Sequence, residues 1–304
     1  MPDPWLADIS IDAVLARSLI EAQFLEFAPA RVEPFSEGWD NAAFLVNDTL
    51  VFRFPRRKVA VPLLQRESRQ LPEIAKRLPV AVPAAEWIGA ATEAYPHPFA
   101  GYRLLPGRTA DRADIGDAAR AGIAPVLGRF LAALHAIPVA EVEALGAIGD
   151  DIGRLDFAKR GPKDLERLAK LEAQGAVDAA LAGKLRRVVE DWPSIAKAPR
   201  ASLVHGDLYS RHLLVDGGAL SGVIDWGDMH LNDPGIDLTI GFLFFPPASR
   251  GTFFTAYGEV SDATLRLARY RAVSHSIAVL PYALQTRDPA LERETRKALA
   301  WAAR

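Results

Sequence analysis

The chain of 304 residues contains no cysteine, which excludes disulfide bonds and thiol chemistry. It also lacks an excess of charge of either sign, because 36 Lys and Arg stand against 38 Asp and Glu, for a net charge of −2. This balance argues against nucleic acid as a partner, since proteins that bind it carry a basic surface. No apolar run reaches the roughly 18 residues that a membrane-spanning helix needs, so we expect no membrane partner.

Other signals are missing as well. Residues 1–8 lack the basic segment that opens a secretory signal peptide, and the chain shows no internal repeat and no low-complexity segment. We therefore expect a cytoplasmic protein. We also expect a monomer. Hydrophobic residues make up 50% of the chain, which allows a sizeable core, and the length suffices for two lobes.

The first part of the chain has a β-rich pattern after one leading helix. Apolar spacing predicts helices over residues 10–24 and 61–78, and strands over residues 32–36, 42–46, 50–54, 82–88 and 99–105. This order predicts a small antiparallel sheet that carries one helix.

After Pro106-Gly107 the pattern becomes mainly helical. Helices are predicted over residues 117–136, 165–171, 177–189, 234–245, 252–257, 263–284 and 289–303. The class is therefore α+β, with a small N-terminal lobe over residues 1–105, a larger helical lobe over residues 106–304, and a cleft expected where the two join.

One predicted β-hairpin interrupts the helical part. Two apolar runs, residues 213–215 and 220–224, flank Asp216-Gly217-Gly218. Glycine supplies the positive φ that a tight turn needs, so these runs are typical of two strands joined by a short turn.

Polar residues gather at the base of this hairpin. Asp207 and His212 lie before its first strand and Asp225 ends its second, so the hairpin would bring the three side chains close together. Acids and imidazoles beside apolar strands indicate a metal ion to bind or a proton to move. Taken alone, this cluster is compatible with a metal-dependent hydrolase, whose metal ligands would be Asp207, His212 and Asp225 together with His205, Asp228 and His230.

Several motifs together resemble those of the aminoglycoside phosphotransferase family. They are His205-Gly206-Asp207 followed by His212, Ile224-Asp225-Trp226-Gly227-Asp228, Gly38-Trp39-Asp40-Asn41, Val51-Phe52-Arg53-Phe54-Pro55-Arg56 and Tyr102-Arg103-Leu104-Leu105-Pro106-Gly107. The resemblance covers residues 33–243 and implies a bilobal protein-kinase-like fold. In its motif detail the chain is most similar to aminoglycoside 2″-kinases and macrolide kinases, which also place His at the position of His212.

The resemblance implies roles for the residues of the hairpin region. Asp207 would accept the proton of the attacking hydroxyl or orient it, and Arg211 stands with Asp207 among the implied catalytic residues. Asp225 and His212 would bind the Mg²⁺ that bridges the nucleotide phosphates. His212 is the unusual member, because Mg²⁺ prefers oxygen ligands to imidazole.

The resemblance also implies a nucleotide, ATP or GTP, bound by the N-terminal lobe. Arg53 stands where kinases usually place a Lys, and Glu67 on the next helix is its natural partner. The first turn would offer phosphate the backbone N–H groups around Gly38 and the hydroxyl of Ser36.

Three further residues would contact the purine from the linker. The resemblance implies that the Arg103 carbonyl and the Leu105 amide bind the base, with Tyr102 as the gatekeeper.

Three polar residues close to the motifs are interpreted as structural. We expect His205 to form hydrogen bonds within its loop and His135, on an apolar helix face, to be a satisfied core residue. Asp237 is expected to cap or brace the catalytic loop.

The sequence therefore predicts a small-molecule kinase that transfers the γ-phosphoryl group of ATP or GTP to a hydroxyl of an antibiotic-like glycoside. An aminoglycoside is the favoured acceptor, which would make the protein an antibiotic-resistance enzyme. The alternatives are a macrolide kinase, an amino-alcohol or sugar kinase, a non-catalytic nucleotide-binding pseudokinase and the metal-dependent hydrolase.

The helical lobe offers two kinds of residue for an acceptor. A polycation would need carboxylates, and the candidates are Asp233, Glu259, Asp262, Asp288, Glu292 and Glu294, partly offset by Arg266, Arg269 and Arg271. A macrolide would suit aromatic side chains, of which Phe242, Phe244, Phe245, Phe253, Phe254 and Tyr257 are more typical of helix core.

Overall fold

The structure is a computed structural model that describes residues 7–38, 40–191 and 201–304. The chain divides into two compact units. The first comprises Met1–Arg77, Ala81–Leu105 and Trp226–Asp228, and the second comprises Leu78–Val80, Pro106–Asp225 and Met229–Arg304. Within the described ranges, no helix combines the length and the hydropathy that crossing a membrane requires.

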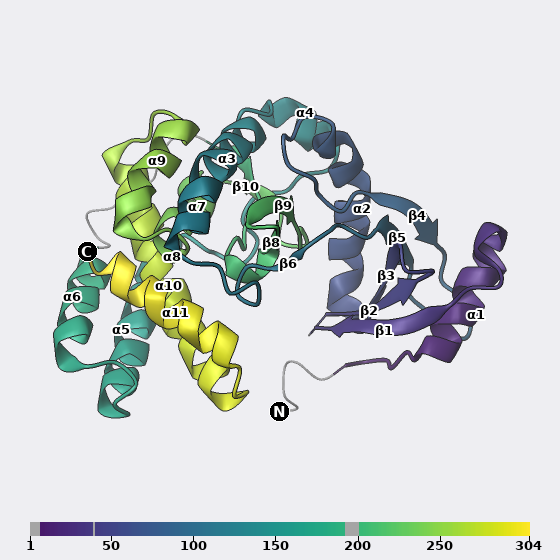
Figure 1. The fold of residues 1–304 in the computed structure, drawn as a ribbon, viewed down its shortest axis with the longest axis horizontal. Coiled ribbons are helices and arrows are strands. Elements are labelled where there is room, and N and C mark those ends of the chain that lie inside the picture. Colours follow the sequence, from purple (N-terminus) through teal and green to yellow (C-terminus); the bar gives the residue numbers. More distant parts are fainter. Residues whose placement is uncertain (1–6, 39, 192–200) are drawn as a thin grey trace. The chain divides into compact units, whose positions relative to one another are not determined.

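The first unit is built on a five-stranded antiparallel sheet with the strand order β1-β2-β3-β5-β4 (Figure 1). Its strands are β1 Val32–Glu37, β2 Asn41–Val46, β3 Leu50–Pro55, β4 Ala85–Gly89 and β5 Phe99–Arg103; its helices are α1 Ala13–Gln23 and α2 Val61–Ala75, with single 3-10 turns η1 Leu25–Phe27 and η2 Lys58–Ala60. The predicted order of strands and helices in this part of the chain is confirmed.

Alternation along the strands gives this sheet two apolar faces. Phe52 and Phe99 point to one face, where they share a buried cluster with Ile20 of α1. Tyr102 points to the opposite face and packs against Leu64 of α2. The two helices therefore cover the two faces, and the same alternation places Arg53, next to Phe52 in β3, on the α2 side.

The second unit is mainly helical and contains short strands. Its helices are α3 Asp117–His135, α4 Val139–Ala144, α5 Phe157–Ala173, α6 Ala179–Glu190, α7 Gly235–Leu238, α8 Ile240–Leu243, α9 Pro247–Tyr257, α10 Asp262–Gln285 and α11 Pro289–Ala302. Its strands are β6 Arg108–Thr109, β7 Ser202–Val204, β8 Leu213–Asp216, β9 Ala219–Val223 and β10 His230–Asn232, and one 3-10 turn, η4, covers Ser210–His212.

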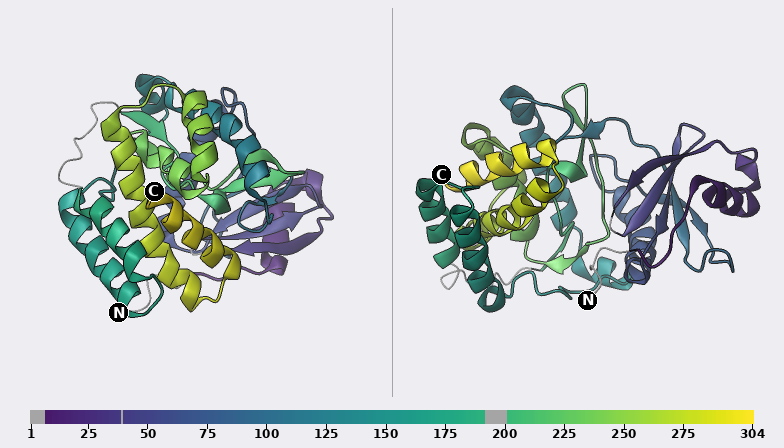
Figure 2. Two further views of the ribbon diagram at one scale, coloured as in Figure 1. Left: turned by 60° about the vertical axis from the view of Figure 1, so that its left-hand side comes forward. Right: turned by 90° about the horizontal axis from the view of Figure 1, so that it is seen from below.

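The long helix α10 organises the helices of this unit. The adjacent helices α5 and α6 pack against it, α11 runs along it, and α7 and α8 also contact it (Figures 1 and 2). Helix α3 packs against α9. The aromatic residues of the α8–α9 region fill this core, since Phe244, Phe245 and Phe253 are fully buried.

The predicted hairpin is formed by β8 and β9, and β6 extends it to three strands. Gly217 and Gly218 occupy the turn with φ values of 56° and 83°, a region that L side chains adopt only with strain. At the other end, the Ile224 N–H donates to the His212 carbonyl at 2.9 Å. The hairpin thus fixes the positions of His212 and of Asp225, which follows Ile224.

Several predicted boundaries were wrong. Residues 82–84 precede β4 as a turn, in which the Ala84 N–H donates to the Val82 carbonyl. The helix predicted over 165–171 begins eight residues earlier, because the Asp156 carboxylate caps α5 by accepting the Lys159 N–H at 3.1 Å. The helix predicted over 234–245 is two short helices, α7 and α8, that meet at Thr239.

Candidate active site

The loop between β7 and η4 holds Asp207. Its neighbour Gly206 has a φ of 92°, so glycine allows a backbone turn there that another residue would adopt only with strain. The buried carboxylate of Asp237 accepts the N–H of His205 at 2.7 Å and the N–H of Gly206 at 3.0 Å. Two charge-assisted hydrogen bonds therefore fix the backbone immediately before Asp207, and the predicted brace is confirmed.

Asp237 is itself held by a buried histidine. His135 Nε2 lies 3.1 Å from Asp237 Oδ2, and His135 Nδ1 lies 3.0 Å from the Tyr257 hydroxyl. Burial by itself raises the pKa of Asp237, but the hydrogen bond and charge of His135, with the His205 and Gly206 contacts, outweigh it and lower that pKa. His135 is thus a satisfied core residue, as predicted.

His205 also serves the loop and not a metal. Its Nε2 lies 2.9 Å from the Ile224 carbonyl, and its Nδ1 accepts the Asp207 N–H at 3.3 Å. Burial lowers the pKa of His205, which favours the neutral ring. Since both ring nitrogens are engaged, the predicted structural role is confirmed.

His212 and Asp225 form the polar pair at the hairpin base. His212 Nδ1 lies 2.6 Å from the Asp207 backbone carbonyl, which only accepts, so this nitrogen must carry the proton. His212 Nε2 then faces Asp225 Oδ2 at 3.3 Å. A neutral Nε2 and a carboxylate oxygen are both acceptors, so a proton or a cation is needed between them.

The backbone at Asp225 is strained in a way that is common at functional sites. Asp225 has a φ of 65°, in the left-handed region that costs a non-glycine residue about 1 kcal/mol. Its side chain is 52% exposed, and the Asp207 side chain is 40% exposed. The structure therefore brings Asp207, His212 and Asp225 together, with two of the three carboxylate or imidazole groups open to a ligand.

Arg211, one residue before His212, is directed at two other carboxylates. Its Nε lies 3.2 Å from Asp111 Oδ2, and its Nη2 contacts Asp288 Oδ2. Asp111 is fully buried. The side chain of Arg211 thus ties η4 to the segment before α3 and to the start of α11.

In the first unit, Arg53 and Glu67 form the predicted ion pair. Arg53 Nη1 lies 2.9 Å and 3.1 Å from the two Glu67 oxygens. The Tyr102 hydroxyl donates to Glu67 Oε1 at 3.1 Å, and burial followed by the Glu67 charge raises the pKa of Tyr102 well above its ordinary value. Glu67 is thus held from β3 and from β5.

The other predicted nucleotide contacts lie along the same sheet. Ser36 is exposed in β1, and the Gly38 N–H already donates to the Asn41 carbonyl at 2.9 Å. A Cβ on Gly38 would meet no atom closer than the Asn41 carbonyl oxygen at 3.8 Å, so the turn has open space beside it. Trp39, which belongs to this motif, lies outside the described residues.

Arg103 and Leu105 follow at the end of β5. The Arg103 side chain turns to Glu86, with Nε 2.8 Å from Oε1. The Leu104 N–H donates to the Thr49 carbonyl at 2.8 Å, which fixes the backbone between the two residues.

Sequence reasoning missed two aromatic residues beside the hairpin base. The Tyr209 ring lies 4.5 Å from the His212 ring and 4.9 Å from the His275 ring, between centroids. Burial lowers the pKa of His275 to about 4, so this ring is neutral at physiological pH. Tyr209 falls inside the recognised motif, whereas His275 comes from the middle of α10, and only packing could reveal it.

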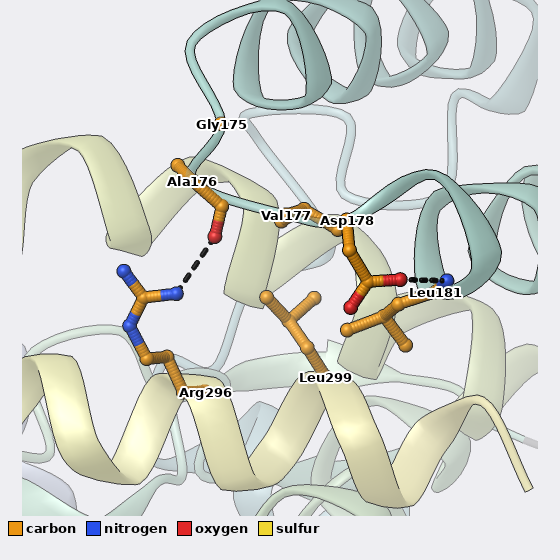
Figure 3. A pocket seen from close by; sticks show the side chains of 7 residues that line it. All are labelled: Gly175, Ala176, Val177, Asp178, Leu181, Arg296 and Leu299. Atoms are coloured by element: carbon orange, nitrogen blue, oxygen red, sulfur yellow. Dashed lines mark hydrogen bonds between the residues drawn. The ribbon is translucent and has the colours of Figure 1, made fainter.

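A surface depression elsewhere in the second unit is separate from these residues. It lies where the α5–α6 connection meets α11, and its lining includes Ala176, Asp178 and Arg296 (Figure 3). Arg296 Nη1 donates to the Ala176 carbonyl at 2.7 Å, and Asp178 Oδ1 accepts the Leu181 N–H at 2.8 Å. Arg296 thus holds the α5–α6 connection to α11, and Asp178 caps the start of α6.

The residues proposed as ligands of a hydrolytic metal centre do not form one. Within the part of the chain that is described, no group of three or more His, Asp or Glu side chains is arranged to hold a metal ion. Both ring nitrogens of His205 form hydrogen bonds within the loop region. His230 Nε2 lies 2.9 Å from the Asn232 side-chain nitrogen. The geometry therefore gives no support to the hydrolase hypothesis.

Comparison with known proteins identifies the family. The model of the phosphotransferase enzyme family, APH, matches residues 31–273. The chain therefore belongs to this family of phosphotransferases, and it has the family's kinase-like α+β fold, as the motifs predicted.

Solved structures resemble the chain over nearly its full length. The GDP and kanamycin complex of the aminoglycoside phosphotransferase APH(2″)-IIIa is 26% identical, with a TM-score of 0.68, over 94% of this chain and 97% of that one. Macrolide 2′-phosphotransferase MphH from Brachybacterium faecium is 26% identical, with a TM-score of 0.57, over 89% of this chain and 91% of that one. A search of curated protein sequences finds no significant match.

Proposed function

We propose that this chain is a small-molecule kinase that transfers the γ-phosphoryl group of ATP or GTP to a hydroxyl of its acceptor. Residues 1–105 form its nucleotide-binding lobe, and residues 106–304 carry the catalytic loop and the acceptor site. It acts in the cytoplasm as a monomer. The observation that carries the proposal is the grouping of Asp207, His212 and Asp225 by one hairpin, in a member of a phosphotransferase family.

Asp207 is the residue that handles the acceptor hydroxyl. Its carboxylate is open to solvent, and its backbone is fixed by the contacts of Asp237 and His205. It accepts the proton of the hydroxyl, or orients it, while the oxygen attacks the γ-phosphorus. Arg211 is a positioning residue in this scheme, because it holds η4 in place through Asp111 and Asp288.

The pair of Asp225 and His212 fits a divalent cation. Two facing acceptors 3.3 Å apart need a positive charge between them, and the half-exposed carboxylate supplies the oxygen that Mg²⁺ prefers. When bound there, Mg²⁺ would neutralise charge on the nucleotide phosphates. Asp225 holds this position with its backbone in the left-handed region, at a φ of 65°.

The nucleotide is bound by residues of the first unit. Arg53, held by Glu67, offers a permanent cation to the α- and β-phosphates. Ser36 and the turn at Gly38 face the phosphates, and the Arg103 carbonyl and Leu105 amide bind the base. Support comes from neighbours solved with GDP, including the APH(2″)-IIIa complex with kanamycin.

Antibiotic-like glycosides are the first acceptors to assay. The predicted preference for an aminoglycoside is supported by the bound kanamycin of that neighbour, and a macrolide by MphH. Of the six candidate carboxylates for a polycation, however, four are engaged by the protein itself, namely Asp233, Asp288, Glu292 and Glu294.

A nucleotide-consumption screen tests the proposal. The full chain with Mg²⁺ and either ATP or GTP is assayed against aminoglycosides, macrolides, amino alcohols, sugars and hydroxy acids. Acceptor-dependent release of ADP or GDP with one phosphorylated product supports the kinase. Nucleotide binding without consumption, for every acceptor, would favour the pseudokinase instead.

A further inference from the structure

One face of α10 carries a cation beside the catalytic loop. Arg271 lies one helical turn before His275, whose ring contacts Tyr209, so the two α10 side chains share a face. Arg271 is close enough to Asp207 for their charges to interact. Its Nε is buried and has no hydrogen-bond partner among the described residues.

Two further arginines reach the same region from α5 and the segment before it. Arg160 lies on α5, and its guanidinium donates to the carbonyls of Gly153 at 2.8 Å and Ile152 at 3.3 Å. Arg154 pairs with Asp150, with 3.5 Å between Nη1 and Oδ1. Within the described ranges, neither Arg160 nor Arg271 forms a salt bridge with a carboxylate.

Grouping these guanidinium ions is costly for the folded protein. Burial lowers the pKa of Arg271 to about 10, with a further lowering from Arg160 and Arg154 that Asp207 only partly opposes. A buried charge without a counter-ion destabilises a fold, whereas a carboxylate or phosphate would satisfy the guanidinium bidentately. Residues that carry such a cost are typical of binding sites.

We propose that Arg271 and Arg160 bind an oxyanion on the acceptor, so that the substrate class is a hydroxylated acid, carrying a carboxylate or a phosphate, and not a polycation. This inference rests on the proposed kinase function, since it assigns the acceptor of the same catalytic loop. The arginines hold the acceptor by its anionic group, and Asp207 takes the hydroxyl.

Matched acceptors test the charge requirement. Glucose, glucuronate and glucose 6-phosphate share a hydroxylated ring and differ in the oxyanion, and kanamycin represents the polycations. Nucleotide consumption should have a higher kcat/KM with glucuronate or glucose 6-phosphate than with glucose, by 10-fold or more. Comparing kcat/KM for glucuronate and for glucose 6-phosphate shows whether the site prefers a carboxylate or a phosphate. A kcat/KM that is highest for kanamycin would overturn the inference and leave the kinase intact.

Substitutions on α10 identify the residue responsible. Arg271→Gln should raise KM for the preferred acid by about 10- to 100-fold, as expected for a lost charge-assisted contact, and leave KM for ATP unchanged. Arg271→Lys keeps the charge but loses the planar guanidinium group. Its KM for the preferred acid should therefore lie between the values of the wild type and Arg271→Gln. Arg266→Gln, exposed on the same helix, is the matched control and should change neither constant.

Inorganic phosphate keeps the inference testable when no acceptor reacts. Calorimetric titration of the full chain with phosphate should give a weaker dissociation constant in Arg271→Gln and Arg160→Gln, by 10-fold or more, and no change in Arg266→Gln. Equal phosphate affinity in all four proteins would overturn the arginine site. Failure of nucleotide consumption with every acceptor would instead overturn the kinase proposal.

Thermal unfolding excludes a purely structural explanation. Because burial and the charges of Arg160 and Arg154 disfavour the Arg271 guanidinium more than Asp207 favours it, Arg271→Gln should unfold at the same temperature as the wild type or higher. A lower melting temperature together with unchanged phosphate binding would mean that Arg271 serves the fold alone.

Discussion

At the scale of single residues, Glu67 depends on Arg53. The Glu67 side chain is 1% exposed and that of Arg53 is 18% exposed, so the carboxylate lies in the interior with the arginine as its counter-charge. Removing one partner of such a pair leaves a buried charge that water cannot solvate. The pair therefore bears on stability as well as on nucleotide binding.

Arg53→Met should lower the free energy of unfolding by about 3 kcal/mol, because it leaves Glu67 buried without its cation. Urea denaturation measures the change. Arg103→Met is the matched control, since its ion pair with Glu86 is exposed and such pairs contribute at most about 1 kcal/mol. Equal losses in the two variants would contradict the role assigned to burial.

The ionised carboxylate of Asp237 stabilises the fold by an amount that depends on pH. Its folded pKa lies below its ordinary value of 3.8, so the stability from its ionised form is complete above pH 3.8 and is lost as pH falls through the lower folded pKa. Asp237→Asn should therefore cost about 2–4 kcal/mol at pH 7 and at pH 5, and less at pH 3. Urea denaturation at the three pH values measures this.

Asp233 serves as a control, because its pKa is shifted in the opposite direction. Burial raises its pKa, so its contribution is complete below pH 3.8 and is lost as pH rises through the folded pKa. Asp233→Asn should therefore gain stability relative to the wild type between pH 3 and pH 7, while Asp237→Asn loses it. Parallel pH profiles for the two variants would rule out these assignments.

At the scale of elements, the β8–β9 hairpin fixes the distance between His212 and Asp225. Its turn needs positive φ at Gly218, which is 83°. Gly218→Ala should destabilise the protein by about 1 kcal/mol. Gly183→Ala within α6 has space for a Cβ and should stabilise by about 0.5–1 kcal/mol. Thermal unfolding of the two variants measures both changes in stability. If Gly218→Ala and Gly183→Ala both stabilised or both destabilised the protein, the result would count against the turn geometry.

Elements with a strong apolar period could be predicted from the sequence. The hairpin, the sheet of the first unit and the long helix α10 all follow from spacing and from glycine at the turn. Strands β7 and β10, of three residues each, could not, because so short a run has no measurable period.

The candidate site divides in the same way. Asp207 and Asp225 stand in a recognisable motif, and Glu67 was expected as the partner of Arg53 because kinases pair this strand residue with a Glu on the next helix. The contact between His135 and Asp237 and the position of Arg271 could not be found, because they depend on how α3 and α10 pack against the loop. Contacts more than 60 residues apart leave no mark on local spacing.

At the scale of the whole molecule, family membership and charge give different information about function. The match over residues 31–273 establishes a phosphotransferase family and a kinase-like fold. The acceptor depends on the few residues that face it, and relatives at 26% identity act on or bind chemically different compounds. Arg271, whose Nε has no hydrogen-bond partner among the described residues, is therefore a better guide to the acceptor of the proposed kinase than the identity of any one neighbour.

The central claim is that Asp207 acts on the acceptor hydroxyl while other residues bind the nucleotide. It is tested most directly by comparing Asp207→Ala with the wild type in acceptor-dependent nucleotide turnover and in nucleotide binding. Turnover should fall by roughly 10²- to 10⁴-fold, the loss expected for a missing general base, with the nucleotide dissociation constant unchanged. Undiminished turnover in Asp207→Ala would contradict the account.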